Sequence, residues 1–168
     1  MGSNGSRIRT LAEIAAMTAI LEAAKFALNA IPNVELVTLL VIVFTRHFGW
    51  KKTLPAVLLF ALLECMWWGF GTWSAVYFYM WPLLVLLTHL VRKEESVWVF
   101  AMLAGFFGLF FGAFSALATV VLFGFRTAFA WWISGIPYDL IHGAANFLIC
   151  LLLYKPLMRA LTEIRHNR

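Results

Sequence analysis

Residues 135–156 read GIPYDLIHGAANFLICLLLYKP, a stretch that is apolar enough to cross a membrane. A membrane-spanning helix needs roughly 20 predominantly apolar residues. Yet Asp139, His142 and Asn146 lie inside this stretch at spacings of three and four, which places them on one face of a helix. Polar groups inside a membrane span are costly and mark either a functional site or a contact between helices. The stretch therefore predicts a membrane helix with one polar face.

The composition of the whole chain agrees with a membrane protein. Of its 168 residues, 63% are hydrophobic and 12% are charged, and the mean hydropathy is +0.87. A soluble domain of this length would need a more charged surface. Cys65 and Cys150 both lie in apolar stretches, which favours packing over a disulfide. No cleavable signal peptide is expected, because the first apolar stretch carries Glu13, Glu22 and Lys25.

Six apolar segments are candidates for membrane spans. They are Leu11–Ala30, Val34–Phe48, Leu54–Phe70, Ser74–Val91, Val97–Phe123 and Ile136–Leu157. The fifth is long enough to tilt or break. We therefore predict an all-α membrane protein with six transmembrane helices in a compact bundle. It forms one domain over residues 11–164, with short ends at 1–10, where MGSNGS is typical of a cloning remnant, and at 165–168.

Basic residues are distributed unevenly over the connections. One set of ends and connections carries nearly all of them: Arg7, Arg9, Arg46, Lys51, Lys52, Arg92, Lys93, Lys155, Arg159, Arg165 and Arg168. The alternate connections carry Arg126 alone. Because basic loops stay in the cytoplasm, this asymmetry predicts that both termini are cytoplasmic. The net charge of +5 is thus a topology signal, and no nucleic-acid partner is expected.

Polar side chains gather at one depth in the predicted bundle. At ~1.5 Å per residue, His142 lies about 9 Å and Asn146 about 15 Å inside the outer start of the last span, and Glu64 lies about 9 Å from the outer end of the third. The inner halves of the spans are mostly aliphatic. We therefore predict a cavity that is open to the outside. Its candidate substrate-binding residues are Glu35, Glu64, Trp67, Trp68, Tyr77, Trp81, Arg126, Trp131, Trp132, Tyr138, Asp139, His142 and Asn146.

Each of these features also has a purely structural interpretation, and both interpretations stay open. Asp139 is near the predicted start of its helix, where a carboxylate stabilises the helix dipole. His142 and Asn146 are suited to hydrogen bonds between helices. Glu22 and Lys25 stand three residues apart and are placed to neutralise each other. The tryptophans at the ends of spans are typical of interface anchors.

Small residues predict two close helix contacts. The segment GFFGLFFG, residues 105–112, has Gly108 and Gly112 at four-residue spacing, and packing inside the bundle is favoured over dimerisation. The first span has a stripe of small side chains that is suited either to its own bundle or to docking on another membrane protein. Its cytoplasmic part consists of Ala12, Ala15, Ala16 and Ala19.

The compact six-helix plan, the alanine stripe and the aromatic outer pocket together resemble a known family. The chain is similar to the substrate-binding S component of energy-coupling factor (ECF) transporters, which import vitamins in prokaryotes. The similarity covers about Arg9 to Ile164 at the level of architecture. Its local motif, Ala-x-x-x-Ala, is matched best by Ala15 and Ala19, although Ala12 and Ala16 fit the same spacing.

The resemblance implies a multi-pass protein of the prokaryotic plasma membrane that captures its substrate from outside. It implies as partners the lipid bilayer, a membrane T component and two cytoplasmic ATPases. The alanine motif would be the docking surface, and the connection Ile31–Glu35 would be a gate. No GxxxxGK[ST] motif occurs, so the chain carries no phosphate-binding loop of its own. No enzymatic activity, cofactor or metal is expected.

The predicted pocket is aromatic and acidic, and this suggests a class of substrate. Flat rings stack on Trp and Tyr side chains, and carboxylates accept hydrogen bonds from ring amines or hold cations. A neutral or cationic nitrogen heterocycle is therefore favoured. Thiamin, its precursors and pyridoxine fit best, and folate fits less well. Cobalamin, riboflavin and queuosine-type precursors remain open.

Two rival functions belong to other classes. The first is an intramembrane enzyme that uses Asp139, His142 and Glu64 for metal or acid–base chemistry. Against it, His142 alone among four histidines lies well inside a predicted span, and no HExxH motif occurs. The second is a membrane assembly subunit that binds no ligand.

Overall fold

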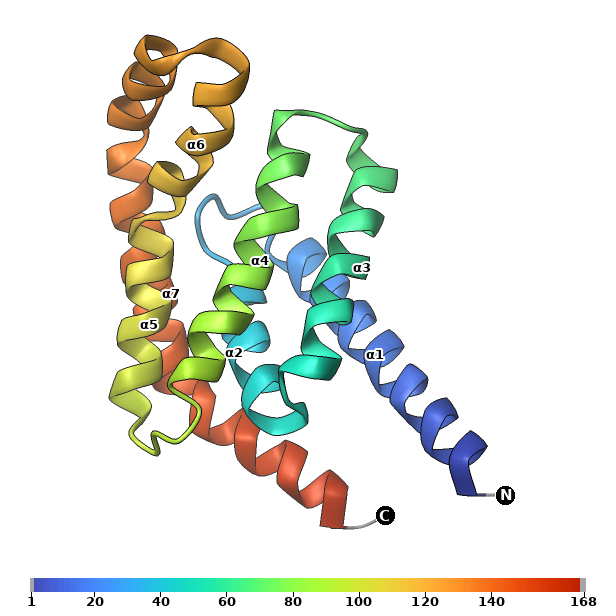
Figure 1. The fold of residues 1–168 in the computed structure, drawn as a ribbon. Coiled ribbons are helices and arrows are strands. Elements are labelled where there is room, and N and C mark those ends of the chain that lie inside the picture. Colours follow the sequence, from blue (N-terminus) through green and yellow to red (C-terminus); the bar gives the residue numbers. More distant parts are fainter. Residues whose placement is uncertain (1, 167–168) are drawn as a thin grey trace.

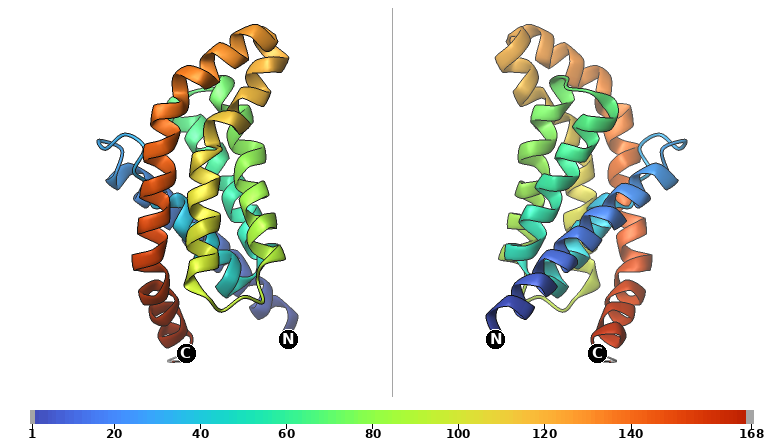
Figure 2. Two further views of the ribbon diagram at one scale, coloured as in Figure 1. Left: turned by 90° about the vertical axis from the view of Figure 1, so that its left-hand side faces the viewer. Right: turned by 90° about the vertical axis from the view of Figure 1, so that its right-hand side faces the viewer.

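The computed structural model describes residues 2–166, which form seven helices and, within that range, no strand (Figure 1). The helices are α1 (Gly2–Ala27), α2 (Val37–Phe48), α3 (Trp50–Trp68), α4 (Thr72–Leu90), α5 (Val97–Leu109), α6 (Phe111–Phe123) and α7 (Phe125–His166). The all-helical prediction is confirmed for the described residues. The start of α1 and the end of α7 lie at the same end of the bundle (Figures 1 and 2).

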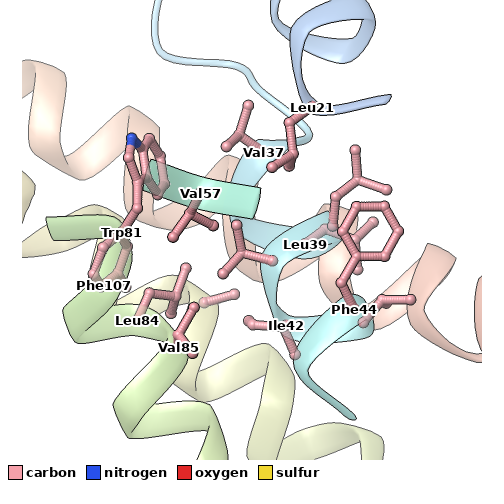
Figure 3. Close-up of a cluster of buried hydrophobic side chains, with 14 of the residues drawn as sticks. Leu21, Val37, Leu39, Ile42, Phe44, Val57, Trp81, Leu84, Val85 and Phe107 are labelled. Atoms are coloured by element: carbon pink, nitrogen blue, oxygen red, sulfur yellow. The ribbon is translucent and has the colours of Figure 1, made fainter. Parts of the chain in front are cut away.

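Helix α2 is short and lies at the centre of the bundle. It has 12 residues, and every residue from Val37 to Thr45 is buried. It packs against α1, α3, α4, α5 and α7. Figure 3 shows Val37, Leu39 and Ile42 of α2 within the buried apolar cluster. A mostly apolar helix of this kind is typical of the core of a bundle.

Because α2 is short, its start lies deep in the bundle. Twelve residues give a helix about 18 Å long, which is well below the roughly 30 Å of a bilayer's hydrocarbon core. The connection from α1 to α2 therefore lies lower than the α3–α4 connection and the α6–α7 joint, which mark the end of the bundle away from the termini (Figure 1). The space beyond the start of α2 is therefore lined by side chains of the neighbouring helices.

Three segments are long and apolar enough to cross a membrane. They are Thr72–Leu90, Val97–Phe123, which joins α5 and α6, and Phe125–Ile164; Val37–Phe48 is a shorter apolar helix. The six predicted spans correspond to α1, α2, α3, α4, the α5–α6 pair and α7. The fifth predicted span does break, at Phe110, the residue between α5 and α6.

Glycines allow α5 and α6 to pack closely on α7. A Cβ atom added at Gly105 would lie 3.0 Å from the Phe147 side chain, and one at Gly108 would lie 3.0 Å from the Cα atom of Gly143. At Gly112, an added Cβ would overlap the Asp139 carboxylate. All three glycines of the segment GFFGLFFG thus face α7, which confirms the prediction of packing inside the bundle.

The prediction for residues 125–135 was wrong. The segment FRTAFAWWISG was expected to be an outer loop, with a helix starting at Ile136, but α7 already begins at Phe125. The first part of α7 curves over the end of the bundle (Figure 2), and Pro137, which lacks a backbone donor, lies inside the helix. Gly135 and Pro137 suggested a break, but a helix of 42 residues tolerates both. The start of α2 also moves, from the predicted Val34 to Val37.

We expect Gly143→Ala to lower the unfolding temperature. The new methyl group would lie 2.9 Å from the Gly105 carbonyl oxygen and 3.1 Å from the Leu109 nitrogen, and backbone atoms have little freedom to move. Overpacking of this kind costs about 1–3 kcal/mol. Gly135→Ala is the control on the same helix, because an added Cβ there meets no atom within 4 Å. Thermal unfolding in detergent measures both, and equal stability of the two variants would contradict the packing.

Candidate functional site

Asp139 caps the start of another helix. The Gly112 N–H donates a hydrogen bond of 3.0 Å to Asp139 Oδ1, and α6 begins at Phe111. The first amides of a helix lack acceptors within the helix, so a carboxylate there is stabilising. The alternative that Asp139 caps its own helix is wrong, because Asp139 lies far inside α7. Its Oδ2 atom is buried with no hydrogen-bond partner among the described residues.

His142 and Asn146 are directed at the start of α2. Glu35 Oε2 accepts a hydrogen bond of 2.8 Å from the Thr38 N–H, and Glu35 Oε1 lies 3.5 Å from His142 Nε2. Burial raises the pKa of Glu35, but the hydrogen bonds from His142 and Thr38 outweigh it and keep the pKa below its ordinary value. Asn146 Nδ2 donates to Thr38 Oγ1 at 3.2 Å. The polar face of α7 thus binds two helix starts.

The first cavity lies beyond the start of α2 and has a volume of about 250 Å³. The α1–α2 connection forms one wall, and α1, α4, α6 and α7 supply the others. Its main polar and aromatic lining residues are Lys25, Asn29, Asn33, Glu35, Tyr77, Trp81, Phe111, Asp139 and His142. It therefore combines aromatic faces with two carboxyl groups and an imidazole.

A second cavity of about 330 Å³ adjoins the first. It is lined by Lys25, Asn29, Glu64, Trp68, Trp73 and Tyr77, of which Lys25, Asn29 and Tyr77 also line the first cavity. Tyr77 stands between Trp73 and Trp81, with ring centroids 5.3 Å and 5.5 Å away in edge-to-face geometry. This geometry is the favourable one for aromatic pairs and holds the rings in fixed positions.

Lys25 is held by Tyr77. Its Nζ atom donates a hydrogen bond of 3.0 Å to the Tyr77 hydroxyl. No ion pair joins Lys25 to Glu22 among residues 2–166, so the interpretation that these two neutralise each other directly is not supported by their geometry. Glu22 is 8% exposed and Glu64 is 2% exposed, and their carboxyl groups lie close enough to interact electrostatically. Two acidic groups are thus buried beside the second cavity.

The structure brings together seven of the thirteen residues proposed from sequence. Those that line a cavity are Glu35, Glu64, Trp68, Tyr77, Trp81, Asp139 and His142. Asn146 is buried and binds Thr38 without lining either cavity. The other five line neither cavity: Trp67, Arg126, Trp131, Trp132 and Tyr138. Trp132 is half-buried, and the remaining four are exposed. Trp67 packs edge-on against Phe26, and the rest lie on the first part of α7.

Five polar or aromatic lining residues were absent from that set: Lys25, Asn29, Asn33, Trp73 and Phe111. Lys25 lies one helical turn from Glu22, which marks it as part of the same polar face. Asn29 and Asn33 lie in the α1–α2 connection, and Asn33, which follows Pro32, has a positive φ of 60°. Phe111 reaches the cavity because the helix breaks at Phe110, and its sequence context is uniformly apolar.

Within residues 2–166, no three His, Cys, Asp or Glu side chains come together as a metal site. No family model, curated protein or solved structure matches this chain.

We expect the effects of Gly112→Ala and Asp139→Ala on the free energy of unfolding to be coupled. The methyl group that Gly112→Ala adds would occupy the position of the Asp139 carboxylate, so this change alone should lower the unfolding temperature. Removing the carboxylate frees that space, and the double variant should therefore lose less stability than the two single losses combined. Contacting residues typically show coupling of about 0.5–3 kcal/mol. Thermal unfolding of the four proteins measures it, and additive losses would contradict the cap.

Proposed function

We propose that this protein is the substrate-capture subunit of an ECF-type importer for a vitamin or a related small nitrogen heterocycle. The observation that carries the proposal is the pair of adjoining cavities, aromatic and acidic, between the α1–α2 connection and the helices that extend beyond α2. Small-molecule sites are concave, with mostly apolar walls and a few placed polar groups. The family resemblance supplies the transport role.

Three apolar helices long enough to span a bilayer support a place in the membrane. The termini lie at one end of the bundle (Figure 1), and the basic residues cluster on that side of the predicted topology. We place this end in the prokaryotic cytoplasm, with both termini inside. The cavities then lie toward the outer half, where a capture subunit meets its substrate.

The lining residues favour a flat, neutral or cationic substrate. Trp73, Tyr77 and Trp81 offer ring faces and edges, while Glu35, Glu64 and Asp139 offer acceptors. Lys25 is a cation in the same region, but its ammonium group is engaged by Tyr77. This balance supports thiamin, its pyrimidine precursors or pyridoxine over dianionic substrates such as folate.

The alanine stripe supports docking on a T component that works with two cytoplasmic ATPases. Ala12, Ala15, Ala16 and Ala19 are all exposed, whereas Met17 and Leu21 on the opposite side of α1 are buried. The stripe therefore does not pack inside this chain's own bundle. Small side chains let two membrane helices approach closely. Because the hydrophobic effect does not drive helices together in lipid, their association depends on such close packing.

The proposal is tested by thermal unfolding of the purified protein with a panel of vitamins and precursors, followed by analysis for products. Stabilisation by one compound that is recovered unchanged supports capture. A ligand present at a free concentration of 100 times its Kd stabilises the folded protein by about 2.7 kcal/mol, which clearly raises the unfolding temperature. Conversion of the compound would instead favour an intramembrane enzyme, and no shift with any compound would favour an assembly subunit.

We expect Glu64→Gln to weaken binding of the stabilising compound at least about tenfold, or about 1.4 kcal/mol. Glu64 lines the second cavity and is 2% exposed, so its charge acts at short range with little screening. Calorimetry measures the affinity. Glu95→Gln is the control, since Glu95 is exposed in the α4–α5 connection. An unchanged affinity in Glu64→Gln would remove Glu64 from the site.

We expect Ala15→Trp or Ala19→Trp to keep near-native substrate affinity and to abolish uptake and co-purification with a T component. Both side chains are exposed on α1 and line neither cavity, so a bulky residue should block docking alone. Leu117→Trp is the control, because Leu117 is an exposed position on α6. Cellular uptake and calorimetry should be measured on the same variants. Joint loss of binding, stability and uptake would contradict the docking assignment.

A further inference from the structure

We propose that the carboxyl groups of Glu22 and Glu64 share one proton and that an organic cation entering the second cavity displaces it. The inference deepens the proposed function and rests on it only for the identity of the natural cation. The exchange is balanced: one monovalent cation enters, and one proton leaves to the solvent. The net charge around the pair is therefore the same before and after binding.

The first support is the geometry of the pair. Glu22 comes from α1 and Glu64 from α3, two helices that pack directly on each other. Both side chains are more than nine-tenths buried. No donor among the described residues binds either oxygen of Glu22 or the Oε1 atom of Glu64. Two buried, ionised and unpaired carboxylates would be strongly unfavourable, whereas a single shared proton removes one charge and joins the two groups by a hydrogen bond.

The second support is the charge balance around the pair: Lys25 interacts electrostatically with both carboxyl groups, and its one positive charge balances one carboxylate of the two. Lys25 of α1 donates to the Tyr77 hydroxyl of α4 and not to a carboxylate. Glu35, in the connection before α2, has its own partners in Thr38 and His142. These are the charged and titratable groups that face the pair from α1, α4 and the α1–α2 connection, and they supply no second cation in contact with it.

The third support is access. Glu64 lines the second cavity together with Trp68, Trp73 and Tyr77. The Glu64 carboxyl also interacts with the Trp68 side chain. A cation beside aromatic rings and a carboxylate is stabilised electrostatically by both. An aromatic ammonium ion therefore matches the chemistry of this cavity, and its charge takes the place of the proton.

The shared proton is tested first by infrared spectroscopy of the wild-type protein at neutral pH. A protonated carboxyl group has a C=O stretching band that a carboxylate lacks. We expect this band to weaken in both Glu22→Gln and Glu64→Gln, because removal of either group leaves the other ionised near Lys25. Glu35→Gln is the matched control and should leave the band unchanged. Spectra in which neither Glu22→Gln nor Glu64→Gln alters the band would overturn the proposal.

The exchange is tested with benzylammonium as the probe and benzyl alcohol as its neutral counterpart. If binding releases one proton, the affinity for benzylammonium rises about tenfold per pH unit, or about 100-fold from about pH 6 to about pH 8. Glu64→Gln should remove this dependence, and benzyl alcohol should show none. A benzylammonium affinity independent of pH, or equal to that of benzyl alcohol, would contradict the exchange. Failure of the vitamin panel would leave both of these results unaffected.

Discussion

The rest of the structure depends on one constraint: the central helix α2 is too short to cross the bundle. All of its residues from Val37 to Thr45 are buried, so its first amides must find partners far from water. Glu35 meets this need for the Thr38 N–H, while Asn146 donates to the Thr38 side-chain hydroxyl. The space beyond the start of α2 is enclosed by the α1–α2 connection and by α4, α6 and α7, and it forms the first cavity. The position of the cavity thus follows from the length of one helix.

Two residues on the polar face of α7 hold helix starts and also line the first cavity. Asp139 caps α6 and His142 contacts the carboxylate that caps α2, yet both side chains also line the first cavity. Asn146, one turn further along, is purely a contact between helices. A ligand in this cavity would therefore touch groups whose hydrogen bonds hold two helix starts. Binding would couple to the α1–α2 connection through Glu35, which gives a physical basis for a gate in that connection.

Much of the fold could be predicted from the sequence because long apolar helices leave a strong pattern. The helical segments and the packing of the glycines in residues 105–112 followed from that pattern, whereas the length of Val97–Phe123 left open whether it tilts or breaks. The segment 125–135 was mispredicted because Gly135 and Pro137 are signals of a break, yet both lie inside the continuous helix α7. Glu64, Asp139 and His142 were found because charge inside a span is rare. The sequence reasoning missed three lining residues: Asn29, Trp73 and Phe111. Their place in the cavities depends on the depth of the α1–α2 connection and on the helix break at Phe110. Neither feature could be read from the local sequence pattern.

The central claim, that these cavities hold a small molecule, is tested most directly by native mass spectrometry of the protein purified from cells supplied with the candidate vitamins. Asn29 lines both cavities at an exposed position, and its neighbour Ala30 is exposed and lines neither. A tryptophan at position 29 would fill the shared space. We expect one bound small molecule in the wild-type protein and in Ala30→Trp, and its loss in Asn29→Trp. Retention of the same molecule by Asn29→Trp, or a wild-type protein that carries none, would contradict this claim.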